Sequence, residues 1–290
     1  MRDLLTIADL GADAIDAILD LSQRADPGRP LAGKGVALLF QKPSARTRNS
    51  TEMAVVQLGG HPVYIQKDEV GIDTRESAED VARTLACYHR VICARVMDHR
   101  HLDRMAAAVD IPVVNLLSDS AHPLQALADL LTVKQLLGRL EGERLAYVGD
   151  ANNVARSLAE ACALLGVELA VASPDGYGFS ADELARLRGV EQFADPVAAV
   201  RGARIVYTDV WVSMGQDDES AARLKAFAPY QVDAKLMAQS DDAFFLHCLP
   251  ARRGEEVAAD VIDGEKSAVW RQAENRMHSA RGALAWALGQ

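Results

Sequence analysis

The sequence predicts an α/β fold in which two doubly wound domains, each with a central parallel sheet, are joined by a long helix. Short apolar or β-branched runs alternate with longer helical patterns, as in parallel sheets that helices cover on both faces. A length of 290 residues corresponds to about two domains. The hydrophobic share of 49% and the charged share of 25% are typical of a globular protein and exclude a disordered or fibrous chain.

The first expected element is a buried strand over residues 36–40, which follows two glycines and precedes Pro43. Ser44 is a good N-cap residue, so a helix should begin there and end at the glycine pair 59–60. The later strands are expected at 63–65, 91–94, 112–115, 145–148, 167–172, 205–207 and 243–246. Helical patterns lie between most of these strands, and examples cover 76–88, 123–137 and 154–165.

The helix expected over 123–137 ends at Gly138 and is predicted to connect the two halves of the chain. A first domain should therefore cover residues 1–130 and be completed by the C-terminal helix, 274–290. The second domain should cover 131–273.

The net charge argues against a nucleic acid or an anionic membrane as the main partner. The chain has 31 Lys and Arg residues and 41 Asp and Glu residues, which gives a formal charge of −10. Both kinds of partner would be repelled at long range. An anionic ligand must therefore be held by a local cluster of cations.

The cysteine pattern and the hydropathy predict a soluble cytoplasmic protein. The 4 cysteines form no C-x-x-C pair, so neither a disulfide framework nor a zinc site is expected. No apolar run approaches the roughly 18 residues that a spanning helix needs. The N-terminus also lacks the pattern of a signal peptide.

Polar side chains follow nearly every expected strand, which is where parallel sheets bind ligands. Ser44, Arg46, Thr47 and Arg48 come after the first strand and at a helix start, where free N–H groups and arginine forks suit a dianion such as phosphate. A solvated basic helix start is the alternative interpretation, but Arg95 at another strand end favours an anion site.

Other candidates are ambiguous when taken singly. His122 precedes a proline at a helix start, with the Gln125 amide one turn on, and a lone histidine there is more often structural. Cys248 has the apolar surroundings of a core cysteine, and Asp209 could simply cap a turn. The segment 149–153 is not a G-x-G-x-x-G fingerprint, so a dinucleotide-binding oxidoreductase is weakly supported.

Five segments in order together resemble the aspartate/ornithine carbamoyltransferase family. They are 40–48 with the phosphate loop, 122–132 (HPLQALADLLT), 209–215 (DVWVSMG), 247–254 (HCLPARRG) and 274–278 (ENRMH). The S-M-G and H-C-L-P segments resemble the ornithine branch of the family rather than the aspartate branch. The resemblance extends from about residue 3 to residue 288.

The resemblance implies transfer of the carbamoyl group of carbamoyl phosphate to the δ-amine of L-ornithine, giving citrulline and phosphate in arginine biosynthesis. The residues implied to bind carbamoyl phosphate are Ser44, the amide of Ala45, Arg46, Thr47, Arg95, His122, Gln125, Cys248, the backbone of Leu249, and Arg276. Those implied to bind ornithine are Asn153, Asp209, Ser213 and the backbone of Met214. Those implied to be catalytic are Arg95, His122, Asp209 and Cys248.

The family chemistry uses no covalent intermediate, metal or cofactor, and none is expected here. The resemblance also implies a homotrimer whose subunits share active sites. An alkyl amine with a pKa near ~10.4 is protonated at neutral pH, so a group must accept a proton before the amine attacks. Asp209 and Cys248 are the candidates, and the sequence does not choose between them.

Two positions depart from the usual family pattern. Ala45 stands where threonine is common, and Glu69 stands where the family usually has a glutamine or histidine that reaches a neighbouring subunit's site. A carboxylate there would repel a phosphate, so Glu69 should be turned away, neutralised by Lys67 or Arg75, or protonated so that it donates to the phosphate, and we expect the ion pair. Two alternatives remain open: another amine acceptor, such as an acylated ornithine or putrescine, and a non-catalytic paralogue that acts as a binding partner.

Overall fold

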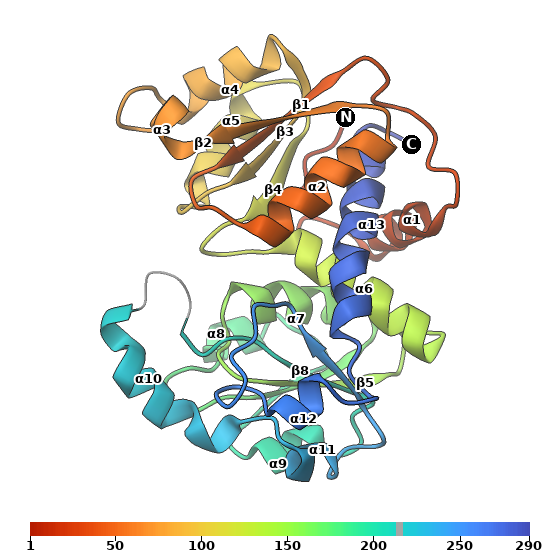
Figure 1. Cartoon of the computed structure of the whole chain (residues 1–290), viewed down its shortest axis with the longest axis vertical. Coiled ribbons are helices and arrows are strands. Elements are labelled where there is room, and N and C mark those ends of the chain that lie inside the picture. The colour runs from red at the N-terminus through yellow and green to blue at the C-terminus, as the bar shows by residue number, and fades with distance from the viewer. Residues whose placement is uncertain (213–216) are drawn as a thin grey trace. The chain divides into compact units, whose positions relative to one another are not determined.

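The computed structural model describes residues 1–212 and 217–290, which form two compact units (Figure 1). Unit 1 contains Met1–Leu131 and Glu274–Gln290, and unit 2 contains Thr132–Ala273. The chain passes between the units within two helices, α6 (Pro123–Leu137) and α13 (Val269–Ala287). No helix in the described ranges is both long and apolar enough to span a membrane.

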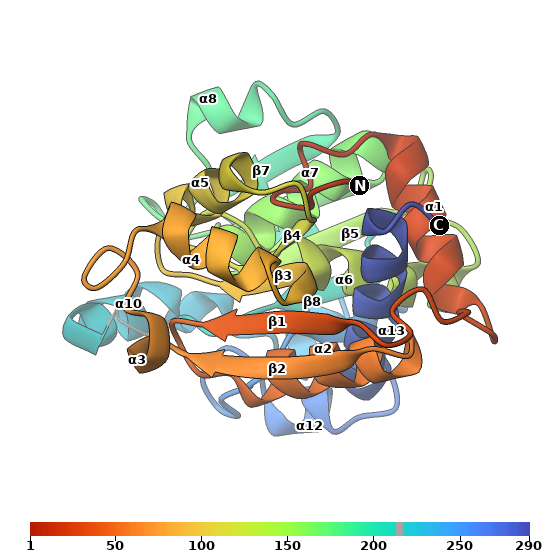
Figure 2. The same ribbon diagram turned by 90° about the horizontal axis from the view of Figure 1, so that it is seen from above.

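Unit 1 is built on a four-stranded parallel sheet with the order β2-β1-β3-β4. Its strands are β1 (Gly35–Phe40), β2 (His61–Gln66), β3 (His89–Arg95) and β4 (Val113–Leu117). Its other helices are α1 (Ala12–Gln23), α2 (Ala45–Gln57), α3 (Lys67–Val70), α4 (Ala78–Ala86) and α5 (Arg100–Ala108). Figure 2 shows α4 and α5 on one side of the sheet and α2 on the other.

Burial and strand register in unit 1 place the loops that carry the predicted site residues at the carboxyl end of the sheet. Alternate residues of the strands, such as Ala37 and Leu39, pack against Val81 and Leu85 of α4 in one apolar cluster. Phe40 pairs with Arg95, so the first and third strands end at the same level. The loops that follow these two strands therefore emerge beside one another.

Unit 2 is built on a five-stranded parallel sheet with the order β7-β6-β5-β8-β9. Its strands are β5 (Arg144–Val148), β6 (Glu168–Ala172), β7 (Val190–Phe193), β8 (Ile205–Thr208) and β9 (Phe244–His247). Its α-helices are α7 (Asn153–Leu165), α8 (Ala181–Leu184), α9 (Pro196–Val200), α10 (Ser220–Phe227), α11 (Ala234–Met237) and α12 (Ala259–Ile262). Short 3₁₀ turns cover Asp217–Glu219 and Ala228–Tyr230.

The predicted α/β class with parallel sheets is confirmed, and the differences from the predicted elements are local. The strand β7 was not expected, because it lies at the sheet edge and carries partly exposed residues rather than a continuous apolar run. The last helix begins at Val269, earlier than the expected 274. The predicted helix start at Ser44 is present, since the Ser44 side chain caps α2.

Candidate active site

The loop between β1 and α2 forms the first part of the site in unit 1. The Ser44 Oγ accepts the N–H of Thr47 at 3.3 Å and donates to the Thr47 Oγ1 at 3.1 Å. Because α2 begins at Ala45, its first N–H groups and the positive end of its dipole are available to an anion. Arg46 lies in this first turn and is exposed.

Arg48 does not extend the anion site, although both arginines of the R-x-R pattern were expected to bind a dianion. Its Nε donates to the Glu52 carboxylate at 2.8 Å, and its guanidinium lies 3.8 Å from the ring centroid of Tyr64. The Arg48 guanidinium is thus bound by the Glu52 carboxylate and the face of the Tyr64 ring, and it serves to hold α2 rather than a ligand. Arg46 is therefore the arginine of this pattern that suits a ligand.

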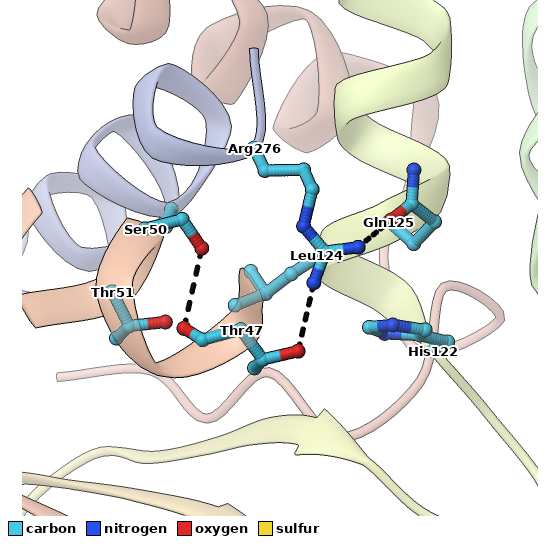
Figure 3. Close-up of a pocket in the computed structure, with 8 residues that line it drawn as sticks. Thr47, Ser50, Thr51, His122, Leu124, Gln125 and Arg276 are labelled. Atoms are coloured by element: carbon cyan, nitrogen blue, oxygen red, sulfur yellow. Dashed lines mark hydrogen bonds between the residues drawn. The ribbon is translucent and has the colours of Figure 1, made fainter. Parts of the chain in front are cut away.

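Four residues that were predicted to bind carbamoyl phosphate, Thr47, Arg95, Gln125 and Arg276, are linked by hydrogen bonds, and Figure 3 shows those that join Thr47, Arg276 and Gln125. The Arg276 Nη2 donates to the Thr47 Oγ1 at 2.7 Å, and the Arg95 Nη1 approaches the same oxygen at 3.4 Å. The other Arg276 nitrogen, Nη1, donates to the Gln125 Oε1. Thr47, Gln125 and Arg276 also line a small pocket, whose other lining residues are Ser50, Thr51, His122, Leu124 and Ala280.

Burial and neighbouring positive charges lower the pKa values of two basic residues in this group, Arg95 and His122. Arg95 is only 6% exposed, and its burial together with the charges of Arg276 and Arg46 lowers its pKa to about 10. It remains protonated at neutral pH. His122 is 4% exposed, and burial with the nearby charges of Arg276 and Arg95 holds its pKa well below the usual value. At neutral pH its imidazole is therefore uncharged and can donate one N–H.

The depressed pKa of His122 predicts a stability change with pH. Below about pH 6.5 the unfolded chain binds a proton at this histidine that the folded chain does not, so the free energy of unfolding should decrease as the pH falls. The slope from one such group is at most about 1.4 kcal/mol per pH unit. Denaturant titrations near pH 7.5 and pH 5.5 should show a smaller decrease in His122→Gln than in wild type. Equal decreases in the two proteins would contradict this assignment.

In unit 2, Asp209 and Cys248 meet because they follow neighbouring strands. Thr208 at the end of β8 pairs with His247 at the end of β9, so the next residue of each strand lies at the same edge. The Cys248 thiol donates to the Asp209 Oδ1 at 3.1 Å, and Asp209 is 6% exposed. The thiol is therefore the donor and the carboxylate the acceptor in this pair.

Two further donors hold the Asp209 carboxylate. The Asn152 Nδ2 donates to Oδ2 at 3.1 Å, and the N–H of Val210 donates to Oδ1 at 2.8 Å. Asn152 is also the N-cap of α7, which fixes the position of the next residue, Asn153. We did not select Asn152 from the sequence, although its place one residue before a helical pattern was a usable N-cap signal.

The buried His247 fixes the loop after β9. In the sequence it was noted only as the first residue of the H-C-L-P segment. Leu249 has a φ of +61°, and its N–H donates to the His247 Nδ1 at 2.9 Å. The other ring nitrogen, Nε2, faces the Glu256 carboxylate at 3.0 Å and must carry the proton. The ring thus orients the segment that carries Cys248 and Leu249.

Possible ligand atoms of Asp209, His247 and Cys248 lie within 4.8 Å of one another, which is close enough for a metal ion. Both ring nitrogens of His247 are already hydrogen-bonded, so a metal would have to displace one of these contacts. Ser213 and Met214, which were predicted to bind ornithine, lie outside the described residues.

Both units match models of one protein family. Residues 2–135 match the carbamoyl-P binding domain of aspartate/ornithine carbamoyltransferases, and residues 141–287 match the Asp/Orn binding domain. The chain belongs to the aspartate/ornithine carbamoyltransferase family. The family resemblance expected from the sequence is confirmed.

Individual members of the carbamoyltransferase family are similar along nearly the whole chain. The ornithine carbamoyltransferase of Thermus thermophilus is 46% identical, with 98% of this chain and 95% of that protein aligned. The anabolic ornithine carbamoyltransferase of Pyrococcus furiosus is 44% identical, with 99% and 96% aligned. The solved structure of ornithine carbamoyltransferase from Pyrococcus furiosus superposes with a TM-score of 0.93 at 44% identity and covers 98% of this chain and 96% of that one.

In this member of the family the departure at Glu69 has a local explanation, and the expected ion pair with Lys67 or Arg75 is wrong. The Glu69 Oε1 accepts the N–H of Gln66 at 2.6 Å, which closes a capping box at the start of α3. Arg75 donates instead to the carbonyls of Asp68 and Glu69, at 3.3 and 3.4 Å. A carboxylate at a helix N-terminus is stabilised by the helix itself, so it needs no cation.

Replacing Glu69 by glutamine should therefore change the affinity for carbamoyl phosphate by less than about twofold between roughly pH 6 and pH 9. Glutamine can form the same capping box without the charge. Binding titrations of wild type and Glu69→Gln across that range provide the measurement. A strong pH dependence seen in wild type alone would mean that the carboxylate acts on the ligand.

Proposed function

We propose that this protein transfers the carbamoyl group of carbamoyl phosphate to the δ-amine of L-ornithine, which gives citrulline and inorganic phosphate for arginine biosynthesis. The observation that carries the proposal is the buried set of Arg95, Arg276, Thr47 and Gln125 beside a neutral His122. These residues offer a group of hydrogen-bond donors and one amide to a small, doubly charged ligand. The anabolic relative from Pyrococcus furiosus supports the biosynthetic direction.

Each unit is proposed to supply one set of contacts. In unit 1, Ser44, the Ala45 amide, Arg46 and Thr47 bind the phosphate, because the start of α2 presents free N–H groups. Gln125 and Arg276 bind the carbamoyl end. In unit 2, Asn153 and Asp209 bind the amino-acid end of ornithine, and Ser213 and Met214 are proposed to share that role.

Arg95, His122 and Thr47 are proposed to stabilise the carbonyl oxygen as the amine adds. The nitrogen lone pair forms a bond to the carbonyl carbon and negative charge develops on the oxygen. The carbonyl then re-forms, the bond to the phosphate oxygen breaks, and the extra proton on the nitrogen passes to the departing phosphate. Donors that are already in place stabilise such charge without reorganisation, and this is commonly the largest catalytic contribution. Burial of Arg95 and His122 strengthens their effect because little water screens them.

The hydrogen bond from Cys248 to Asp209 supports Asp209 as the final proton acceptor while it binds the amino-acid end: the attacking amine gives its proton to the Cys248 sulfur as the thiol proton passes to the carboxylate. The thiol donates to the carboxylate, so the carboxylate offers the acceptor atoms. Most of the amine is protonated at neutral pH, with a pKa near ~10.4 in water. A carboxylate that receives or shares this proton raises the fraction of amine that can attack.

A panel of amines tests the proposal. Carbamoyl phosphate is incubated with L-ornithine, N-acetylornithine, putrescine or L-aspartate, and the ureido product is measured. Product should form only with ornithine. Product from one of the other amines instead would establish another acceptor, and the absence of product from every amine would indicate a non-catalytic paralogue. A homotrimer with shared active sites and a cytoplasmic location remain further proposals, which sedimentation and cell fractionation can test.

A further inference from the structure

The proposed site contains a buried carboxylate to which no role has been given. Asp129 lies one helical turn after Gln125 on α6, and neither side chain is more than 1% exposed. The Gln125 Nε2 donates to the Asp129 Oδ1 at 2.7 Å. The same amide accepts from Arg276 through its oxygen, and the contact is visible in Figure 3.

This arrangement fixes which end of the Gln125 amide faces the pocket. A guanidinium can only donate hydrogen bonds, so the Gln125 oxygen must face Arg276, and the Gln125 NH₂ then faces the Asp129 oxygen that accepts from it. The reverse orientation would set donors against donors and acceptor against acceptor. Asp129 therefore holds the Gln125 oxygen on the side of Arg276, and it acts on the pocket through Gln125.

We propose that Asp129 is a positioning residue that selects carbamoyl phosphate over acyl phosphates without an amine, by keeping the Gln125 oxygen available to the carbamoyl NH₂. The inference rests on the proposed function. Arg95 and Arg276 supply only donors, which suit the carbonyl oxygen and the phosphate. The carbamoyl NH₂ needs an acceptor, and the fixed Gln125 oxygen provides one. Acetyl phosphate carries a methyl group in place of this NH₂ and gains nothing from that oxygen.

The test uses three ligands with wild type and three variants of the full chain. Dissociation constants for carbamoyl phosphate, acetyl phosphate and inorganic phosphate are measured by calorimetry, and unfolding temperatures are recorded. In Asp129→Asn the neighbouring amide can donate or accept, so Arg276 alone still favours the original orientation of Gln125, which is then held less firmly. This variant should lose about tenfold in affinity for carbamoyl phosphate and change by less than about twofold for the other two ligands.

The double variant Asp129→Asn with Gln125→Glu is a rescue. The new carboxylate presents only acceptor oxygens, so one can accept from the new amide and the other can face Arg276 and the carbamoyl NH₂. The net charge of the pair is unchanged. Affinity for carbamoyl phosphate should return to within about threefold of wild type. If Asp129→Asn does not fold, the double variant alone decides. A preference of the double variant for carbamoyl phosphate over acetyl phosphate equal to that of wild type supports the proposal, and loss of this preference overturns it.

Glu143→Gln is a matched control, because Glu143 is also a buried carboxylate, 3% exposed, whose contacts are with Arg139 and Arg204 in unit 2. All three dissociation constants should stay within about twofold of wild type. Unchanged carbamoyl phosphate binding in Asp129→Asn, or equal losses for all three ligands, would overturn the inference. Wild type that binds no carbamoyl phosphate would instead overturn the proposed function. In turnover, Asp129→Asn should raise KM for carbamoyl phosphate and leave KM for ornithine unchanged.

Discussion

Replacing Arg95 by methionine should lower kcat by a factor of about 10²–10³, the usual cost of removing one preorganised donor from a developing oxyanion. Arg95 is buried at the end of β3 and approaches the Thr47 hydroxyl, and no ion pair to a carboxylate is seen for it in the described part of the chain. Methionine has a similar length, so the change removes the charge and the donors with little change in volume.

The same variant should keep its stability. Burial and the like charges of Arg276 and Arg46 lower the pKa of Arg95, which means that the folded protein holds this cation at a cost. Removing the charge relieves that repulsion, so the unfolding temperature should remain the same or increase. Loss of activity with retained stability is what we expect of a residue kept for catalysis.

Steady-state kinetics and thermal unfolding of Arg95→Met provide the measurement. Arg83→Met is the control, because Arg83 is an exposed arginine of α4 in the same unit and should leave both quantities unchanged. A kcat for Arg95→Met within about threefold of wild type would show that Arg95 does not stabilise the reacting carbonyl.

Replacing Asp209 by asparagine should lower kcat/KM for ornithine by about 10²–10³ and leave the affinity for carbamoyl phosphate within about threefold. The carboxylate accepts from Asn152, Val210 and Cys248, and asparagine keeps the shape but removes the charge that a cationic amine requires. Truncating one member of a buried charge pair typically costs about 2–5 kcal/mol, which is the origin of this range.

Kinetics with ornithine as the varied substrate, together with calorimetry for carbamoyl phosphate, test Asp209→Asn. Asp195→Asn is the matched control, since Asp195 caps α9 in the same unit and asparagine is an equally good N-cap residue. Unchanged ornithine kinetics combined with weakened carbamoyl phosphate binding would reverse the roles assigned to the two units.

The sequence predicted the parts of the fold and site that depend on local pattern. Alternating apolar strands and helices identify parallel sheets, and parallel sheets place the residues after their strands at one edge. This is why Arg95 could be selected before its surroundings were known, whereas Asp209 and Cys248, which also follow strands, were ambiguous until the family resemblance gave them a role. The pairing of Thr208 with His247 then explains why Asp209 meets Cys248, because both residues follow neighbouring strands.

Contacts between distant positions could not be predicted in this way. Arg276 reaches Gln125 across 151 positions of sequence, and only the family resemblance suggested a role for it. Arg48 was misjudged because its engagement depends on Tyr64, which arrives from another strand. The sequence analysis did not select Asp129, although its spacing of four from Gln125 places the two side chains together on a helix. The pair gains a role only through Arg276, which contacts Gln125 from a distant part of the sequence.

The central claim is tested most directly by following one isotope through the reaction. Carbamoyl phosphate labelled with ¹³C at the carbonyl carbon is incubated with L-ornithine and the protein, and the products are quantified by NMR together with the inorganic phosphate released. We predict that the label appears in the ureido carbon of citrulline, in an amount equal to the phosphate released, and that both require ornithine. Phosphate release without labelled citrulline, or no reaction with both substrates present, would contradict the proposed carbamoyl transfer.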